Sequence, residues 1–322
     1  MIHTGTDHIY LPDSALESLG IEPPEVADAI EAALRAKSDG RLHTTPKSAI
    51  LPGDGRYMMS TLAVGDDGLV VLKAVGVYPG NAARDLDAIN GAVIVMDAET
   101  GLLRAVMGAN WITAVRTAAL SAVAARRLAN PAAETVAFVG CGIQASSHLA
   151  AFMSMFPLKK IYAVGRGAAN VARLCEEAKE LGLEAEGAIA EDALRQVDLV
   201  VSSITLDYSV TPFLEASWLK PGAFATITDL FIPWTPDSAE VVDTIVVDDL
   251  EQERTSEKPM VPPDRITDDL TGLIGRGDLS FEPDKVTAFA FRGLALGDYA
   301  AAALALRKAE ATGAGQRIGA RP

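Results

Sequence analysis

Cysteine, histidine and basic residues are scarce in this chain of 322 residues, and each scarcity excludes a class of function. The two cysteines, Cys141 and Cys175, form no Cys-x-x-Cys pair and are too few for a disulfide framework, so a reducing cytoplasm is the expected compartment. Four histidines at scattered positions lack the spacing of metal ligands, so we expect no metal site. A formal net charge of −15 argues against nucleic acid as a partner, because phosphate binding needs clustered Lys and Arg.

The sequence also lacks a long uncharged apolar run. Its most apolar stretch, ITAVRTAALSAVAARRLA, contains three arginines, so it predicts a globular helix rather than a membrane span. The N-terminus has no basic region followed by an apolar stretch, which argues against a signal peptide. With 49% hydrophobic and 22% charged residues, the composition is typical of a globular enzyme without a membrane partner.

The first third of the chain mixes helical and strand patterns. Apolar spacing predicts a helical region over 14–38 and another helix over 112–128. Between them, residues 57–62, 69–77 and 91–97 are short β-branched runs separated by turns rich in Gly and Asp, which is typical of antiparallel strands. This part therefore predicts an α+β domain.

From Glu134 onward the pattern alternates between strand and helix. The apolar strands ETVAFVG, KKIYAVG, DLVVSSI, GAFATITDL and DTIVVDDL alternate with helical stretches such as AANVARLCEEAKELG, which indicates a doubly wound parallel sheet of α/β class. YAAAALALRKAEA predicts a final helix that returns to the first domain, and GAGQRIGARP a frayed tail. The expected division is 1–115 with 299–322, and 116–298.

The segment VGCGIQA has the context of a dinucleotide-binding turn, with an apolar strand before it and a helix after it. Gly140 permits the tight turn, and Gly142 lets the backbone approach a pyrophosphate at the helix N-terminus. Ala145 stands at the third position, where close packing of helix on strand requires only a small residue. We therefore expect bound NAD(P); the alternative is a glycine turn without a ligand.

The acidic residue that holds the adenosine ribose of NAD is missing. Gly165 stands at its position, and Arg166 follows directly. Because an arginine there can pair with a 2′-phosphate, the segment favours NADP(H) slightly over NAD(H). Alternatively, Arg166 is a solvated loop residue.

Three further stretches, together with the glycine turn, resemble the ornithine cyclodeaminase/mu-crystallin family: LKAVGVYPGN (72–81), WITAVRTAALSAVAA (111–125) and FRGLALGDYAAA (291–302). The similarity extends from about residue 14 to 307. It implies a homodimer whose first domain binds substrate and pairs strands across subunits, and whose second is a Rossmann-type domain, with the active site in the cleft between the domains.

The resemblance also implies chemistry on small imino or amino acids with NAD(P). The leading hypothesis is a ketimine reductase or amino-acid dehydrogenase. One alternative is a cyclodeaminase that releases ammonia and uses bound NAD catalytically. Another is an NADPH-regulated ligand-binding protein of the mu-crystallin kind.

Two cations match family positions that bind the substrate carboxylate. Arg116 interrupts an apolar helix stripe, where an unpaired cation would be costly, and its guanidinium suits a bidentate carboxylate contact. Lys47 stands where relatives have arginine, so it keeps the charge but loses the bidentate contact. Arg292, beside Gly293, is a third candidate that would face a polar or acidic substrate group; the alternative is a cation on the outer face of the last strand.

Two residues match the proton-transfer groups of the family. Lys73 lies inside the apolar strand VVLKAVGV, where burial and a nearby cation would lower its pKa; by alternation alone it could face solvent. Asp229 closes the strand GAFATITD, at the strand end where doubly wound sheets bind ligands. The following block, ITDLFIPW, lacks the glycines of the family pattern, so Asp229 could instead be a turn or cap residue.

The remaining cofactor contacts implied by the resemblance lie near the glycine turn and at strand ends. They are Thr117, Ile143, Gln144, Thr205, Thr226, Thr228 and Gly293. His148 is expected to pack near the sheet rather than act in catalysis, and Cys141 to be a small residue of the turn.

Overall fold

The structure, a computed structural model, describes residues 7–319, except for the side chain of Ala82. The described chain forms two compact units. Unit 1 contains the residues up to Arg116 and those from Gly293 onward, and unit 2 contains Thr117–Arg292. The sequence predicted the boundaries at 115/116 and 298/299, whereas the structure assigns Arg116 and the segment from Gly293 to Asp298 to unit 1.

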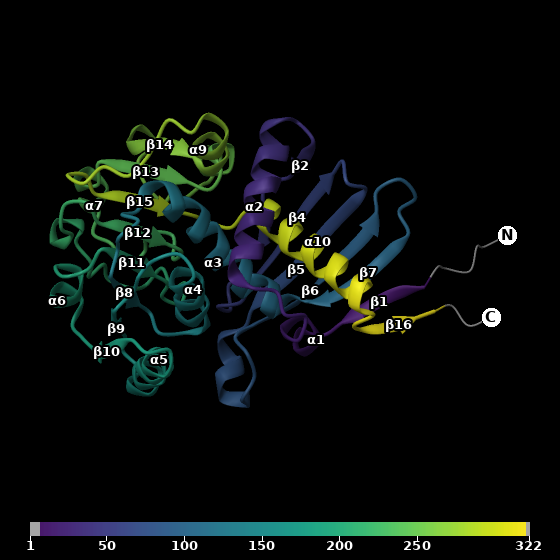
Figure 1. Cartoon of the computed structure of the whole chain (residues 1–322), viewed down its shortest axis with the longest axis horizontal. Helices are drawn as coiled ribbons and strands as arrows, with labels where there is room; N and C mark the ends of the chain where they lie inside the picture. The colour runs from purple at the N-terminus through teal and green to yellow at the C-terminus, as the bar shows by residue number, and fades with distance from the viewer. Residues whose placement is uncertain (1–6, 320–322) are drawn as a thin grey trace. The chain divides into compact units, whose positions relative to one another are not determined.

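Unit 2 is built on an eight-stranded sheet in the order β10-β9-β8-β11-β12-β15-β13-β14, and every neighbouring pair is parallel (Figure 1). Its strands are β8 (Thr135–Val139), β9 (Lys160–Val164), β10 (Glu184–Gly187), β11 (Leu199–Ser202), β12 (Phe224–Ile227), β13 (Thr244–Val247), β14 (Ile266–Asp269) and β15 (Thr287–Ala290). The strand order reverses direction between β8 and β11, which is the switch point where such sheets bind dinucleotides. The predicted doubly wound parallel sheet is confirmed.

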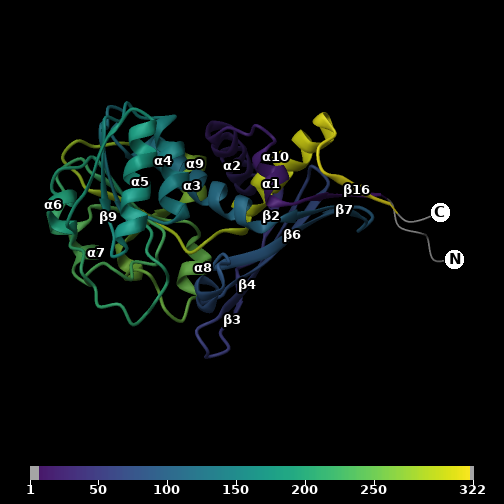
Figure 2. The same cartoon turned by 90° about the horizontal axis from the view of Figure 1, so that it is seen from below.

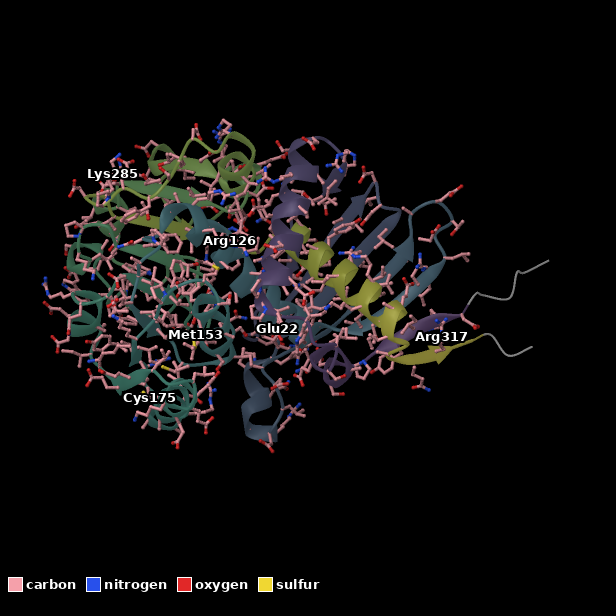
Figure 3. The ribbon with its side chains drawn as sticks, in the orientation of Figure 1. Glu22, Arg126, Met153, Cys175, Lys285 and Arg317 are labelled. Carbon is pink, nitrogen blue, oxygen red and sulfur yellow. The ribbon has the colours of Figure 1, made fainter. Side chains whose placement is uncertain are left out.

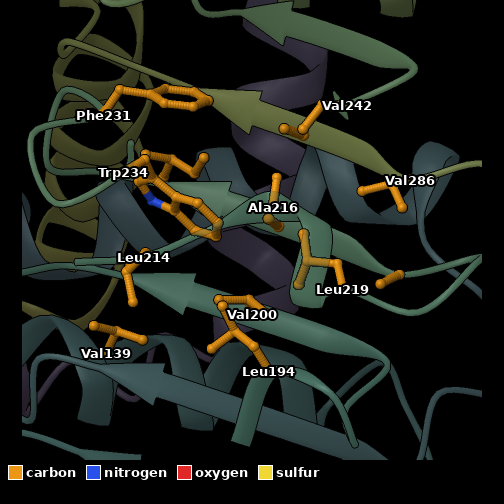
Figure 4. Close-up of a cluster of buried hydrophobic side chains, with 14 of the residues drawn as sticks. Val139, Leu194, Val200, Leu214, Ala216, Leu219, Phe231, Trp234, Val242 and Val286 are labelled. Carbon is orange, nitrogen blue, oxygen red and sulfur yellow. The ribbon is translucent and has the colours of Figure 1, made fainter. Parts of the chain in front are cut away.

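Helices cover both faces of this sheet. They are α3 (Ala109–Leu128), which begins in unit 1, α4 (Ile143–Met153), α5 (Ala168–Glu180), α6 (Ala190–Leu194), α7 (Ser238–Val241), α8 (Leu250–Arg254) and α9 (Leu270–Arg276), with 3-10 turns η2 (Ala216–Trp218) and η3 (Pro263–Arg265). On one face, alternate strand residues such as Val139 and Val200 pack with Leu194 of α6 and with Val242 after α7 (Figure 4). On the other face, the hydroxyl of Ser121 on α3 lies 2.7 Å from that of Thr226 on β12 and 2.8 Å from the Nε2 atom of His148 on α4.

Unit 1 contains a second sheet, of order β16-β1-β7-β6-β5-β4-β2, with β3 also paired to β4. Its strands are β1 (His8–Leu11), β2 (Leu42–Thr44), β3 (Ser48–Ile50), β4 (Tyr57–Gly65), β5 (Leu69–Val77), β6 (Ile89–Asp97), β7 (Leu103–Gly108) and β16 (Gln316–Ile318). The pairs from β4 to β7 are antiparallel, as predicted for the three strands that the sequence indicated.

One face of the unit 1 sheet is covered by helices. They are α1 (Asp13–Glu17), α2 (Pro23–Ser38) and α10 (Ala295–Thr312), and a 3-10 turn, η1 (Pro79–Arg84), follows β5. Figure 2 shows α1, α2 and α10 on one side of the strands. Strand residues on that side are buried: Lys73 on β5 is flanked by buried Val71 and Val75. The alternate residues of these strands face away from the helices.

The prediction of a frayed C-terminal tail is wrong for the described part of the tail. Gly313 ends α10 in the left-handed conformation, and the chain then turns back as β16. This strand pairs antiparallel with β1, with His8 opposite Ile318. A strand of three exposed residues has no amphipathic pattern, so only its pairing partner reveals it.

Candidate functional site

A buried charged cluster in unit 1 joins a lysine, an aspartate and an arginine. Lys73 on β5 stands directly opposite Thr61 on β4, and both reach Asp298, which lies in the first turns of α10. The Lys73 Nζ donates to Asp298 Oδ1 at 2.6 Å, and the Thr61 hydroxyl donates to Oδ2 at 2.8 Å. Arg116 completes the cluster, with Nε 3.1 Å from Asp298 Oδ1. Asp298, Lys73 and Arg116 are 1%, 1% and 7% exposed.

Burial and the neighbouring charges set the charge state of this cluster. Burial, together with the positive charge of Arg116, lowers the pKa of Lys73 to about 8 against the opposing pull of Asp298. Burial alone would raise the pKa of Asp298, but the charges of Lys73 and Arg116 and the bonds from Lys73 and Thr61 outweigh it, so this pKa is lowered. Lys73 can therefore gain or lose a proton near neutral pH beside a permanent anion and a permanent cation.

The guanidinium of Arg116 has unused hydrogen-bonding capacity. Its Nη1 is buried and has no hydrogen-bond partner among the described residues. A Cβ placed on Gly293 would lie 3.8 Å from Arg116 Nη1 and 3.8 Å from Lys47 Nζ, so two cations approach the same point. Gly293 has φ of +113° and no side chain to fill the space. A carboxylate there would supply the acceptors that a buried guanidinium requires.

The glycine turn of unit 2 has the geometry of a pyrophosphate site. Gly140 has φ of +96°, and a Cβ there would lie 2.5 Å from the Ser203 carbonyl oxygen, so only glycine fits. A Cβ on Gly142 would meet nothing within 4 Å, which leaves open space at the N-terminus of α4. The first amides of a helix preceded by open space bind phosphate well. This part of unit 2 therefore fits a dinucleotide.

The predicted cofactor residues around this turn differ in their surroundings. Ile143, the first residue of α4, is 65% exposed. The Oε1 atom of Gln144 is buried without a hydrogen-bond partner in the described chain. Thr205, which follows β11, is exposed. Arg166 follows β9 in an exposed loop, and its charge adds to the hydrogen bonds from Ser209 that lower the pKa of Asp207.

The three other predicted threonines have internal positions. Thr117 is 5% exposed. The Thr228 hydroxyl donates to the Ser202 carbonyl at 3.0 Å. Thr226 is fully buried, and its hydroxyl lies 2.7 Å from that of Ser121. The structure therefore uses the hydroxyls of Thr226 and Thr228 within unit 2, and their assignment to the cofactor stays a prediction.

Asp229, the second residue after β12, is a buried carboxyl group that has no charged partner among residues 7–319. Its Oδ2 accepts from the Ser202 hydroxyl at 2.6 Å and from the Ile204 amide at 3.1 Å. Its Oδ1 is buried and accepts nothing from the described residues. Burial raises the pKa of Asp229 to about 6, although the hydrogen bonds from Ser202 and Ile204 act to lower it. Such a carboxyl group can donate or accept a proton near neutral pH.

The structure gives Arg292 an internal role. Its guanidinium forms an ion pair with the buried carboxylate of Glu253 at 3.0 Å and donates to the Lys258 carbonyl at 2.8 Å. These contacts lie within unit 2 and join the end of β15 to α8 and the loop that follows it. A role for Arg292 in binding substrate stays a prediction, and the ion pair supplies a structural reason for its presence.

His148 and the two cysteines lie in packed surroundings. His148 is fully buried, and burial lowers its pKa to about 4. Its Nδ1 contacts the Gln144 carbonyl at 2.7 Å, and its Nε2 lies 2.8 Å from the Ser121 hydroxyl. Both cysteines are buried thiols, with Cys175 on α5 (Figure 3), and burial raises the pKa of Cys141 to about 11. At neutral pH the Cys141 thiol is therefore protonated and unreactive, and the His148 imidazole is neutral.

Residues 7–319 contain neither a metal-binding cluster nor a membrane-spanning helix. No group of three His, Cys, Asp or Glu side chains in that range could hold a metal ion. Within the same range, no helix is long and apolar enough to cross a membrane.

Sequence reasoning missed Asp298, Ser202 and Trp234. The segment ALGDYAAAALAL did contain a signal for Asp298, because an aspartate within an otherwise apolar helix needs a buried counter-charge. No comparable signal marked Ser202 or Trp234, because serine and tryptophan are ordinary residues of strand ends and turns. Their role depends on hydrogen bonds between residues distant in the chain, Ser202 with Asp229 and with Trp234.

A parallel sheet with a glycine turn at its switch point, together with buried titratable Lys and Asp side chains, is typical of an NAD(P)-dependent oxidoreductase. A family model is more specific: residues 14–313 match the ornithine cyclodeaminase/mu-crystallin family, and the chain belongs to it. The resemblance predicted from the sequence is thereby confirmed.

Individual relatives agree with this assignment. The chain is 28% identical to an alanine dehydrogenase of Archaeoglobus fulgidus, over 96% of this chain and 98% of that protein. It is 33% identical to a Δ1-pyrroline-2-carboxylate reductase of Burkholderia multivorans, over 64% of this chain and 66% of that protein. The solved structure of an archaeal alanine dehydrogenase dimer with bound NAD superposes with a TM-score of 0.86 at 26% identity, covering 97% of this chain and 99% of that one.

Proposed function

We propose that this enzyme reduces the C=N bond of a small imino acid that carries a carboxylate, with NADPH as the preferred hydride donor. The observation that carries the proposal is the buried Arg116 Nη1, which has no hydrogen-bond partner among the described residues and lies, like Lys47 Nζ, 3.8 Å from the space that a Cβ on Gly293 would occupy. A carboxylate in that space would be held by two cations. The same reaction in reverse is the oxidation of the corresponding amino acid.

Each residue has a role that follows from the geometry within its own unit. Arg116 and Lys47 bind the carboxylate, and Asp298 holds Lys73 and Arg116 in place. The reduced nicotinamide, when bound, supplies a hydride to the imine carbon. The imine nitrogen gains one proton for each hydride, and either Lys73, with a pKa of about 8, or Asp229, with a pKa of about 6, is suited to deliver it.

The preference for NADPH rests on the end of β9. Gly165 offers no carboxylate to a ribose hydroxyl, and Arg166 is exposed directly after it. A guanidinium in this loop suits a 2′-phosphate, which would add a charged contact that NADH lacks. Two buried thiols without a disulfide agree with a cytoplasmic enzyme.

A substrate panel tests the proposal. Cyclic imino acids and 2-oxo acids with ammonia would be offered with NADPH and NADH in parallel, and the nicotinamide absorbance followed. We expect NADPH oxidation with at least one cyclic imino acid, and a large rise in KM in Arg116→Ala. Arg35→Ala, which removes an exposed arginine of α2, is the matched control.

Other outcomes would reassign the chain. Release of ammonia from ornithine or lysine without net nicotinamide oxidation would indicate a cyclodeaminase. Tight NADPH binding without turnover of any imino or amino acid would indicate a binding protein of the mu-crystallin kind.

We further propose that the enzyme is a homodimer that pairs through the open face of the unit 1 sheet. Leu62, Leu72, Ile94 and Val106 lie opposite one another on four adjacent strands, and all are only partly buried. Near one end of this sheet is a hollow of about 330 Å³ lined by Ile50, Met58 and Tyr78, among others. An apolar row of this length is typical of a buried interface. The archaeal alanine dehydrogenase described above is itself a dimer.

The mass in solution tests this interface. Leu72→Glu would place a charge in the apolar row, and we expect it to convert a dimer into a monomer by light scattering. Val241→Glu, at an exposed apolar position of unit 2, should leave the mass unchanged. A wild-type monomer would contradict the proposal.

A further inference from the structure

The two oxygens of the Asp229 carboxyl group have different surroundings. Oδ2 accepts two hydrogen bonds, one from the Ser202 hydroxyl and one from the Ile204 amide. Oδ1 is equally buried but has no donor among the described residues. An oxygen that already accepts two donors has no room for a proton of its own, whereas the other oxygen does. A proton on Asp229 is therefore directed to Oδ1.

The hydroxyl group of Ser202 is itself oriented by a second donor. The indole Nε1 of Trp234 donates to Ser202 Oγ at 3.2 Å. An indole N–H can only donate, so the serine oxygen must accept, and its single hydrogen is left for Asp229 Oδ2. Trp234, Ser202 and Asp229 thus form a chain of hydrogen bonds that can run in only one direction. All three side chains are buried, with exposures of 3%, 0% and 0%.

The turn after Asp229 holds the indole in this position. Leu230 and Phe231 both have positive φ, +60° and +61°, a conformation that costs side-chain-bearing residues about 1 kcal/mol or more each. The turn is closed by bonds from the Ile232 amide to the Asp229 carbonyl and from the Trp234 amide to the Phe231 carbonyl. The rings of Phe231 and Trp234 pack together in the apolar cluster of unit 2 (Figure 4). This packing maintains a backbone that glycine would adopt without strain.

We propose that Ser202 and Trp234 are positioning residues for Asp229, which hold Oδ2 as a permanent acceptor and leave Oδ1 as the oxygen that carries the exchangeable proton. This inference rests on the proposed function only in giving that proton a destination, the nitrogen of the reduced substrate. In that step the Oδ1–H bond breaks, an N–H bond forms, and the carboxylate left behind keeps its bonds from Ser202 and Ile204. The Asp229 proton is then restored from solvent.

No charged side chain among the described residues contributes to the pKa of Asp229; the causes are burial and hydrogen bonds from Ser202, Ile204 and its own backbone amide. Removing a bond to the ionised form should therefore raise this pKa further. We expect Ser202→Ala to raise it by about one pH unit and Trp234→Phe by about half a unit, because the phenylalanine leaves the Ser202 hydroxyl unoriented. Ser202→Thr, which keeps the hydroxyl, should leave the pKa of Asp229 at its wild-type value.

The experiment is an NMR titration of the full chain with ¹³C-labelled aspartate, with and without NADPH. The Asp229 signal is identified by its loss in Asp229→Asn, and Trp218→Phe, a tryptophan of η2, is the matched control. If the pH midpoint of the Asp229 signal is unchanged in both Ser202→Ala and Trp234→Phe, the proposal is overturned. If Ser202→Ala fails to fold, Trp234→Phe carries the test alone. Neutron diffraction near pH 5 should place a deuteron on Oδ1, and a deuteron on Oδ2 would also overturn it.

The titration separates this inference from the proposed function. It needs no substrate, so a shifted midpoint supports the positioning role even if no imino acid is reduced. If a substrate is found, the pH at which kcat/KM changes should move with the NMR midpoint in each variant. A pH profile that stays fixed while the midpoint moves would show that the Asp229 proton is not the one transferred.

Discussion

Asp298 in unit 1 and Asp229 in unit 2 are the same residue type at the same depth, yet their pKa values shift in opposite directions. Asp298 is 1% exposed and Asp229 is 0% exposed. The pKa of Asp298 is lowered by the charges of Lys73 and Arg116, in spite of burial. That of Asp229 is raised to about 6 because burial is opposed only by neutral donors. The charge of the partner, rather than burial, decides which aspartate is an anion and which can carry a proton.

This difference separates two tasks that one carboxyl group could not perform together. A permanent anion in unit 1 holds two buried cations, Lys73 and Arg116, in the cluster for which we propose the binding of an anionic substrate. A carboxyl group that titrates near neutral pH in unit 2 can exchange a proton. Four substitutions test the comparison, beginning with the largest expected effect.

Asp298→Asn should destabilise the protein strongly. The change leaves Lys73 and Arg116 buried without a counter-charge, and breaking a buried ion pair from one side costs about 3–5 kcal/mol. Urea unfolding at pH 7 measures the effect. As a control, Glu310→Gln breaks an exposed pair with Arg104, with side chains 40% and 39% exposed, and should change stability by less than about 1 kcal/mol. Equal effects of the two substitutions would refute the contrast.

Asp229→Asn should change the stability of the protein in the opposite direction and stabilise it. The folded-state pKa of Asp229, about 6, lies above its ordinary 3.8, so ionisation opposes folding at every pH above about 6 and ceases to do so below about 4. Removing the ionisable group should stabilise the chain by about 1–3 kcal/mol at pH 8. The gain should shrink as the pH falls towards 5, which urea unfolding at both pH values would reveal. A loss of stability at pH 8 would contradict this account.

Gly293→Ala tests the space between the two cations of unit 1. The added Cβ would lie 3.8 Å from Lys47 Nζ and from Arg116 Nη1, and the positive φ of +113° would be strained. We expect a loss of about 1 kcal/mol in stability and a rise of about ten-fold in KM for a carboxylate substrate. Gly313→Ala is the control, because its φ is +69° and nothing lies within 4 Å of the new atom. It should lose stability through backbone strain and leave KM unchanged. A similar KM in both variants would remove Gly293 from the site.

Arg166→Ala should have the smallest effect, confined to the coenzyme. An exposed charged contact contributes about 0.5–1.5 kcal/mol, so KM for NADPH should rise about three- to ten-fold while KM for NADH stays unchanged. Steady-state kinetics with both coenzymes measure this, and Arg173→Ala, which removes another arginine near the turn, provides a contrast. Arg173 donates to the Cys141 carbonyl and should affect both coenzymes alike. If the ratio of the KM values for NADPH and NADH is unchanged in Arg166→Ala, then Arg166 is a solvated loop residue that does not contact the coenzyme.

Much of the fold could be predicted because its signals are local. The alternation of strands and helices from Glu134, the glycine turn and the three antiparallel strands each follow from short periodic patterns. The strand β16 could not, because its three exposed residues have no pattern apart from their pairing with β1. The expected domain boundary at 298/299 missed Gly293 and Asp298 for a related reason, since no composition change marks the point where the chain enters unit 1.

The site shows the same limit. Lys73, Arg116 and Asp229 were predicted because they match positions of the family pattern. The apolar surroundings of Arg116 and the strand-end position of Asp229 supported the match, whereas alternation alone left the orientation of Lys73 open. Their partners were missed, because a hydrogen bond between Ser202 and Trp234, or between Lys73 and Asp298, joins residues far apart in the chain. Arg292 has the same charge as Arg116 and was given the same role, yet its guanidinium contacts Glu253.

The sequence by itself determined that unit 2 is a doubly wound nucleotide-binding sheet, because glycine spacing and apolar periodicity are properties of short segments. It also identified Lys73, Arg116 and Asp229 as candidate site residues, because they match positions of the family pattern. Only the tertiary structure decided what those charges do. A pKa depends on groups within a few ångströms in space, and these come from strands and helices separated by up to 237 positions, as Thr61 and Asp298 are.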